Sequence, residues 1–176
     1  MSLTQSQPLQ LHDQATQVHV ALWINVSNAS ELHQRLLGGD TTVNCALINP
    51  EAVVDPFQVM VAVHRAAEAL EQQQLRTRNI YSEIVYNLSP NKSIKEAFTR
   101  FGLNPTCKTI LAVRVGGSQE AFDNEVGATI VGEPAALERL SSVTSLDKVR
   151  QYYKLPANTS NILNAAVGAM ALKGYT

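Results

Sequence analysis

The chain has few of the residues that mark a disulfide-stapled or metal-bound protein. Only two cysteines, Cys45 and Cys107, occur among its 176 residues. Neither forms a CxxC pair or has a histidine at metal-ligand spacing, so a disulfide scaffold and a zinc site are both disfavoured. We expect two free thiols in a reducing compartment, and therefore a protein of the cytoplasm and nucleus.

An excess of charge of one sign and long apolar runs are also absent. The formal net charge is -1 and charged residues make up 16% of the chain. This balance argues against a protein that coats nucleic acid or binds membranes through a polybasic surface, although it leaves a local basic patch open. No apolar run reaches the roughly 18 residues that a membrane span requires, so no membrane segment is expected.

Sequence motifs of catalysis are missing as well. No two of the four histidines stand at metal-ligand spacing within one predicted element; they are His12, His19, His33 and His64. There is no GxGxxG motif, phosphate-binding loop, nucleophile elbow or kinase signature. We therefore predict no catalytic residue, no metal and no cofactor. A small hydrolase or transferase with a dispersed site remains an alternative, because distant residues can converge in a fold.

The predicted elements mix helices and strands without a regular βαβ rhythm. Residues 1–16 are polar and glutamine-rich and are expected to be a flexible N-terminal segment, whereas 17–176 form a single domain without repeats or linkers. Strands are predicted from near Val18 and over 41–49, 82–89, 108–117 and 127–133. This order favours an α+β fold, with helices packed on a mostly antiparallel sheet of about four to five strands.

The middle of the chain carries the clearest helix signal. Asp55 is a good N-cap, and Pro56 suits the first helical position because it needs no hydrogen-bond acceptor there. Residues 57–63 are apolar almost all round, so this helix is expected to be buried. Residues 82–89 alternate between apolar and polar types and predict a half-buried strand, and Ser93 then caps a short amphipathic helix.

Three stretches give the chain a family resemblance. They are INPEAVVDPFQ over 48–58, SEIVYNLSPNKSIKEAFTRFGL over 82–103 and VRQYYKL over 149–155. In these the chain resembles the PRPK-binding protein (TPRKB) family, the small kinase-binding subunits of the KEOPS/EKC complex, and the likeness extends over nearly the whole chain. It implies a non-catalytic partner of a small atypical kinase, in a complex that makes the threonylcarbamoyladenosine modification of tRNA.

The last predicted helix, from about residue 160 to 173, is too apolar for an ordinary surface helix. Its apolar side chains wrap most of its circumference. Because a terminal helix rarely buries two faces in its own domain, either the whole helix is internal or one side meets a partner. The resemblance favours the second possibility, since it implies docking on the kinase through helical apolar surface. The predicted anchors are Ile162, Leu163, Val167 and Met170.

Between residues 76 and 108 there are six basic and two acidic side chains. The predicted RNA-binding residues in this stretch are Arg76, Arg78, Lys92 and Lys95, and a solvated basic face is the alternative. The resemblance implies a role in holding the tRNA acceptor end. However, Lys92-Ser93 stands where the family pattern has Arg-Gln, which weakens direct tRNA contact more than it weakens kinase docking.

Together these features predict an adaptor subunit that is monomeric alone, binds and regulates a PRPK-type kinase and reaches the other KEOPS/EKC subunits indirectly. A contribution to recruiting tRNA is part of this hypothesis. A stand-alone tRNA-binding module is the alternative.

Overall fold

The computed structural model describes residues 2–11 and 14–175. The elements in chain order are β1 (Gln5–Leu11), β2 (Gln14–Ile24), α1 (Ala29–Leu37), β3 (Ala46–Ile48), the 3-10 helix η1 (Pro50–Ala52), α2 (Pro56–Glu71), α3 (Ile80–Leu88), α4 (Ile94–Phe101), β4 (Ile110–Val115), α5 (Gln119–Thr129), β5 (Glu133–Ala135), the 3-10 helix η2 (Leu137–Arg139), α6 (Leu140–Val143), α7 (Leu146–Tyr153) and α8 (Ile162–Ala171). No helix within these residues is long and apolar enough to cross a membrane.

The sheet is antiparallel and follows the order β1-β2-β4-β3, with β5 also pairing to β2. The long strand β2 lies at its centre, with Ala21 opposite Ala112 of β4. The other edge of β2 is shared by two strands. Its residues up to Val20 pair with β1, and its residues from Leu22 onward pair with β5. The predicted α+β fold, with helices on a mostly antiparallel sheet of four to five strands, is confirmed.

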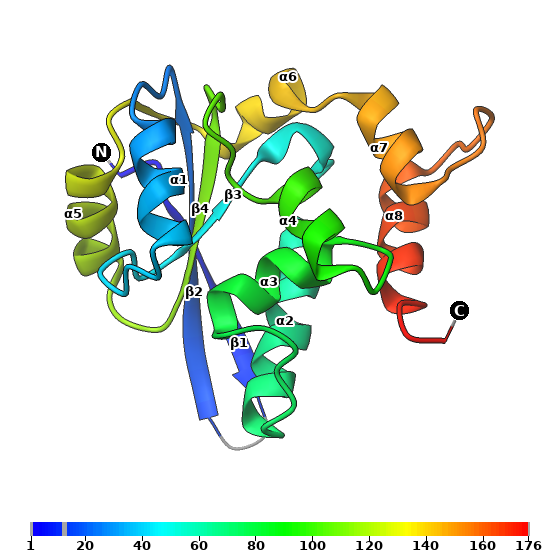
Figure 1. The fold of residues 1–176 in the computed structure, drawn as a ribbon, viewed down its shortest axis with the longest axis horizontal. Coiled ribbons are helices and arrows are strands. Elements are labelled where there is room, and N and C mark those ends of the chain that lie inside the picture. The colour runs from blue at the N-terminus through cyan, green and yellow to red at the C-terminus, as the bar shows by residue number, and fades with distance from the viewer. Residues whose placement is uncertain (1, 12–13, 176) are drawn as a thin grey trace.

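Helices cover both faces of this sheet (Figure 1). Val20 and Leu22 of β2 face α2, α3 and α4, with α7 and α8 farther out, whereas Ala21 between them faces α1 and α5. This division follows from the strand backbone, in which successive side chains point to opposite faces. We call these two halves of the molecule the α2–α8 side and the α1–α5 side.

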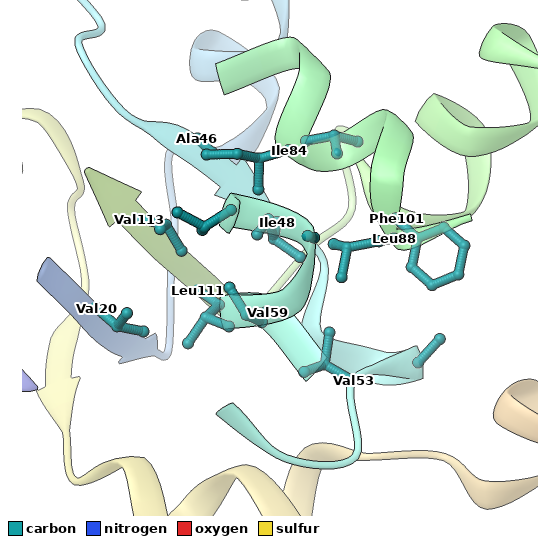
Figure 2. Packing of buried hydrophobic residues seen from close by; sticks show 14 of the residues in the cluster. Val20, Ala46, Ile48, Val53, Val59, Ile84, Leu88, Phe101, Leu111 and Val113 are labelled. Carbon is teal, nitrogen blue, oxygen red and sulfur yellow. The ribbon is translucent and has the colours of Figure 1, made fainter. Parts of the chain in front are cut away.

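The larger core lies on the α2–α8 side. Figure 2 shows Val59 of α2, Ile84 and Leu88 of α3 and Phe101 of α4 packed over aliphatic residues of β2, β3 and β4. Helix α2 begins where the sequence predicts, because the Asp55 carboxylate accepts the Phe57 amide at 2.8 Å. The N-cap Ser93 of α4 is likewise confirmed.

Residues 82–89, predicted as a strand, belong to helix α3 and the residue that follows it, so that prediction was wrong. The helix begins with a capping box between Asn79 and Ser82. Residues 83–88 are all buried between α2, α4 and β3. When every side of a helix is buried, apolar residues stop marking a single face, and a short segment can imitate strand alternation.

Two other strand predictions also differ from the structure. The first strand begins well before Val18, and residues Gln5–Leu11 of the segment expected to be flexible form β1, paired along its length with β2. The strand predicted over 127–133 is wrong, because α5 continues to Thr129 and β5 starts only at Glu133. Helix α5 keeps its apolar spacing through Phe122 and Val126 and so extends over the sheet.

Candidate functional site

Helix α8 lies at the outer edge of the α2–α8 side (Figure 1). Asn161 starts it by accepting the Asn164 amide at 3.0 Å. One face packs inward through Ala166 and Met170, which are one turn apart and have no exposed surface. The helix therefore packs against its own domain along a single narrow face.

Two cationic side chains connect the end of α8 to neighbouring helices through hydrogen bonds. The Arg65 guanidinium of α2 donates to the Met170 carbonyl, and the Lys173 ammonium donates to the Tyr86 carbonyl of α3. The same ammonium lies 3.2 Å from the centre of the Tyr86 ring. Burial, together with the positive charge of Arg65, lowers the pKa of Lys173 to about 7. The end of the chain is thus held in a defined position.

Helix α8 and the residues that follow it retain apolar surface. Leu163 and Val167 are half-buried, Leu172 is 57% exposed and Tyr175 is 87% exposed. We call these four residues the α8 surface. Of the four predicted anchors, Leu163 and Val167 lie on it. Ile162 packs against the core, and Met170 is fully buried, so the structure gives it a place in the core rather than on the surface.

A second apolar patch lies on α4 and was not predicted as a surface. The spacing of Ile94, Ala97, Phe98 and Phe101 suggests one buried face, yet only Ala97 and Phe101 are buried. Ile94 and Phe98, one turn apart, are 42% and 38% exposed. Apolar spacing alone could not separate the two pairs, because it marks a wide face without showing how much of that face a neighbour covers.

The four predicted RNA-binding residues are all exposed, but they do not form one cluster. Arg76 and Arg78 precede α3, whereas Lys92 and Lys95 follow it. Nine helical residues between the two pairs span about 13 Å. Only the lysines lie beside the exposed Ile94 and Phe98, and the two pairs therefore form separate surfaces.

The loop that carries the two arginines is held by a buried carboxylate. Glu83 is 2% exposed and accepts the amides of Arg76 and Thr77 at 3.0 and 2.9 Å, as well as the Thr77 hydroxyl at 2.7 Å. A buried carboxylate needs such partners, since leaving it unpaired is costly. The loop before α3 consequently has a fixed shape.

The histidines of the described residues lie outside the two best-formed pockets, whose ionisable lining residues are Asp123 in one and Asp55 and Glu138 in the other. His19 bonds the Ser6 hydroxyl at 2.7 Å and the Gly117 carbonyl at 2.9 Å, but neither Ser6 nor His19 lines either of the two best-formed pockets in the described residues. His64 lies 4.0 Å from Glu68 on the surface of α2. His33 is half-buried on α1, and His12 lies outside the described residues. Among residues 2–11 and 14–175, no three His, Cys, Asp or Glu side chains are grouped to hold a metal ion.

Burial also makes the two thiols poor nucleophiles. Both cysteines are free and buried, and burial raises the pKa of Cys45 to about 12 and raises that of Cys107 as well. In contrast, the exposed features of the α2–α8 side are apolar helix surface and lysine side chains, which suit contacts with another macromolecule.

Comparisons with known proteins agree with this description. The family model described as "Kinase binding protein CGI-121" matches residues 23–174. The chain is 33% identical over 172 residues to the EKC/KEOPS complex subunit TPRKB of Danio rerio, covering 96% of this chain and 97% of that protein. It is 32% identical to the EKC/KEOPS complex subunit cgi121 of Aspergillus terreus, covering 90% and 92%, and 29% identical to that of Schizosaccharomyces pombe, covering 92% and 95%. The chain therefore belongs to the CGI-121 family of kinase-binding proteins.

Proposed function

We propose that this chain is a non-catalytic adaptor subunit of an EKC/KEOPS-type complex and that it binds the PRPK-type kinase of that complex through the α8 surface. The observation that carries the proposal is the apolar exposure at the end of the chain: Leu172 and Tyr175, which follow α8, are exposed, and Leu163 and Val167 on the helix are half-buried. The helix itself is already fixed to its own core. The family description and the names of the relatives support the kind of partner.

The role we propose is regulatory as well as architectural. A fixed α8 presents its side chains without an ordering step, which lowers the entropic cost of association. Docking would then favour one arrangement of the kinase and so raise its activity, and contacts with the remaining subunits would run through the kinase. The complex as a whole would carry out the threonylcarbamoyladenosine modification of tRNA.

Size-exclusion chromatography with the kinase tests the docking. Val167→Glu and Leu163→Glu each place a charge on the α8 surface, and we expect either to abolish the one-to-one complex seen with the wild type. Leu37→Glu is the matched control, because Leu37 is 70% exposed on α1, across the sheet from α8. Loss of the complex with Leu37→Glu, or its survival with both α8 variants, would contradict the proposal; circular dichroism checks that each variant is folded.

The surface formed by Lys92, Ile94, Lys95 and Phe98 favours a contribution to tRNA binding. Lysines attract phosphates, and an exposed aromatic ring offers a base a stacking surface. Lys92→Glu/Lys95→Glu should weaken tRNA binding by the assembled complex and reduce its dependence on salt, whereas Arg76→Glu/Arg78→Glu is the comparison at the other end of α3. Tight tRNA binding by the isolated chain would instead favour the stand-alone module.

A further inference from the structure

The α1–α5 side carries an acidic surface of its own. Residues 118–138 include five carboxylates and no lysine or arginine. Glu125 pairs with Arg114 at 2.5 Å. Asp123 accepts the hydroxyls of Ser2 and Thr4, and Glu133 accepts an amide of Asn25 at 3.2 Å. Within residues 2–11 and 14–175, no lysine or arginine forms an ion pair with Glu120, Asp123 or Glu133.

A pocket of about 340 Å³ opens on this surface. It lies where β1 and β5 meet along the edge of β2, and Asp123 belongs to its wall. The rest of the lining is mainly apolar, from the segment before β1 and from β2, α5 and β5. The apolar side chains of this lining are Leu3, Ala21, Trp23, Phe122, Val126 and Pro134.

The pocket wall contains an unsatisfied donor. The indole Nε1–H of Trp23 is buried and has no hydrogen-bond partner among the described residues. A buried N–H without an acceptor costs free energy, and an incoming carbonyl oxygen would remove that cost. Because this N–H has no exposed surface, an incoming acceptor reaches it only if the Trp23 ring turns as the pocket is entered. Leu3, which is 41% exposed, lines the same pocket.

We propose that this acidic surface docks a basic, extended segment of a partner protein, with one apolar side chain of the segment in the pocket. The neighbouring backbone carbonyl of the segment would accept from Trp23, and flanking lysines or arginines would face Glu120, Asp123 and Glu133. The carboxylates repel nucleic acid, and they extend beyond the pocket, which fits a peptide better than a small cation. The proposal is independent of kinase docking, because α8 lies across the sheet (Figure 1).

The fluorescence of Trp23 gives a direct test, since it is the only tryptophan of the chain. The probe is a short synthetic peptide with a central Phe flanked by lysines. We expect a saturable change in Trp23 emission, weakened about tenfold when the central Phe is replaced by Ala, which corresponds to about 1.4 kcal/mol. A peptide with glutamates in place of the lysines should leave the emission unchanged.

Variants of the protein sharpen the test. Glu120→Lys/Glu133→Lys should weaken binding of the basic peptide about tenfold, an effect that added salt reduces. Trp23→Phe, followed by anisotropy of a labelled peptide, should also weaken binding because it removes the donor. Val167→Glu on α8 is the matched control and should bind the peptide like the wild type.

Three results would overturn the proposal. The first is an unchanged Trp23 emission at millimolar basic peptide. The second is equal binding by the charge-reversed protein or by the Ala peptide. The third is an equally strong response to a short RNA oligonucleotide, which would show that the pocket does not select a basic segment.

Discussion

The two sides of the sheet are built from neighbouring residues of the same strands, yet they differ in how they are filled. Toward α2–α8 the strands present large aliphatic side chains such as Leu22, Leu111 and Val113. Toward α1–α5 the same strands present Ala21 and Ala112 at neighbouring positions of the sheet, with Leu47 and Ile110 also in that core. The α2–α8 side carries two successive layers of helices, whereas the α1–α5 side carries one layer with polar groups inside it.

Those polar groups are a second difference. On the α1–α5 side, Arg114 is 5% exposed, donates to the Asn44 carbonyl at 2.8 Å and lies over the Phe122 ring. On the α2–α8 side the buried polar groups mostly link helices, as when Gln58 donates to Tyr153 at 2.7 Å and Tyr153 donates to the Leu88 carbonyl. One side therefore depends chiefly on aliphatic packing and the other on a few specific polar contacts.

The largest expected loss of stability comes from a core residue on the α2–α8 side. Met170→Ala should lower the free energy of unfolding by about 2–5 kcal/mol, because it leaves a cavity between α8 and α2. Val167→Ala, on the same helix but half-buried, should cost much less. Urea unfolding followed by circular dichroism compares the two, and equal losses would show that α8 is not held by one face.

A smaller loss of stability is expected when polar contacts on the α1–α5 side are removed. Arg114→Met should lower the free energy of unfolding by about 1–3 kcal/mol, since it removes the charged hydrogen bond to the Asn44 carbonyl and the ion pair with Glu125. Glu125→Gln alone should cost less, because the Glu125 side chain is 56% exposed. If both changes were neutral in thermal unfolding, packing alone would stabilise the α1–α5 side.

The attachment of α8 should depend on pH. Because the pKa of Lys173 falls from 10.5 to about 7 on folding, the unfolded chain binds more protons between these values. The stability of the wild type should therefore rise with pH across that window relative to Lys173→Met, and the difference between the two should level off below about pH 7. Urea midpoints at several pH values measure this, and parallel curves would contradict it.

The smallest expected effect is on the rate at which the two cysteines are alkylated, which involves no change of fold. Because burial raises the pKa of Cys45 to about 12, iodoacetamide at pH 8 should alkylate it far more slowly in the folded protein than in urea. Mass spectrometry of the cysteine peptides follows both thiols, and Cys107 should also be protected. Equal rates in folded and unfolded protein would show that the α1–α5 side opens readily.

Much of the secondary structure could be predicted where a local signal exists. Asp55-Pro56 and Ser93 begin their helices as predicted, and Gly116 and Gly117 follow β4 at positive φ, where glycine is favoured. The wrong strand at 82–89 had a local signal too, because Asn79 and Ser82 form a capping box. Tertiary burial hid the helical pattern, since a helix covered on every side has no polar face to reveal its period.

Less of the candidate site could be predicted. Helix α8 was recognised as too apolar for a surface helix, and Leu163 and Val167 are indeed partly exposed. The inward turn of Met170 could not be predicted, because the orientation of a uniformly apolar helix depends on its neighbours. Nor does sequence spacing show that α3 separates the arginines from the lysines.

The sequence by itself determined where α2 and α4 begin, that helices and a mostly antiparallel sheet form the fold, and to which family the chain belongs. The helix starts reside in caps that act over a few neighbouring residues, and the family resides in three motif stretches. Only the tertiary structure decided which apolar side chains are core and which form surface, and it placed Trp23 in a pocket wall without a hydrogen-bond partner. Burial depends on elements that are distant in the chain, so local chemistry cannot decide it.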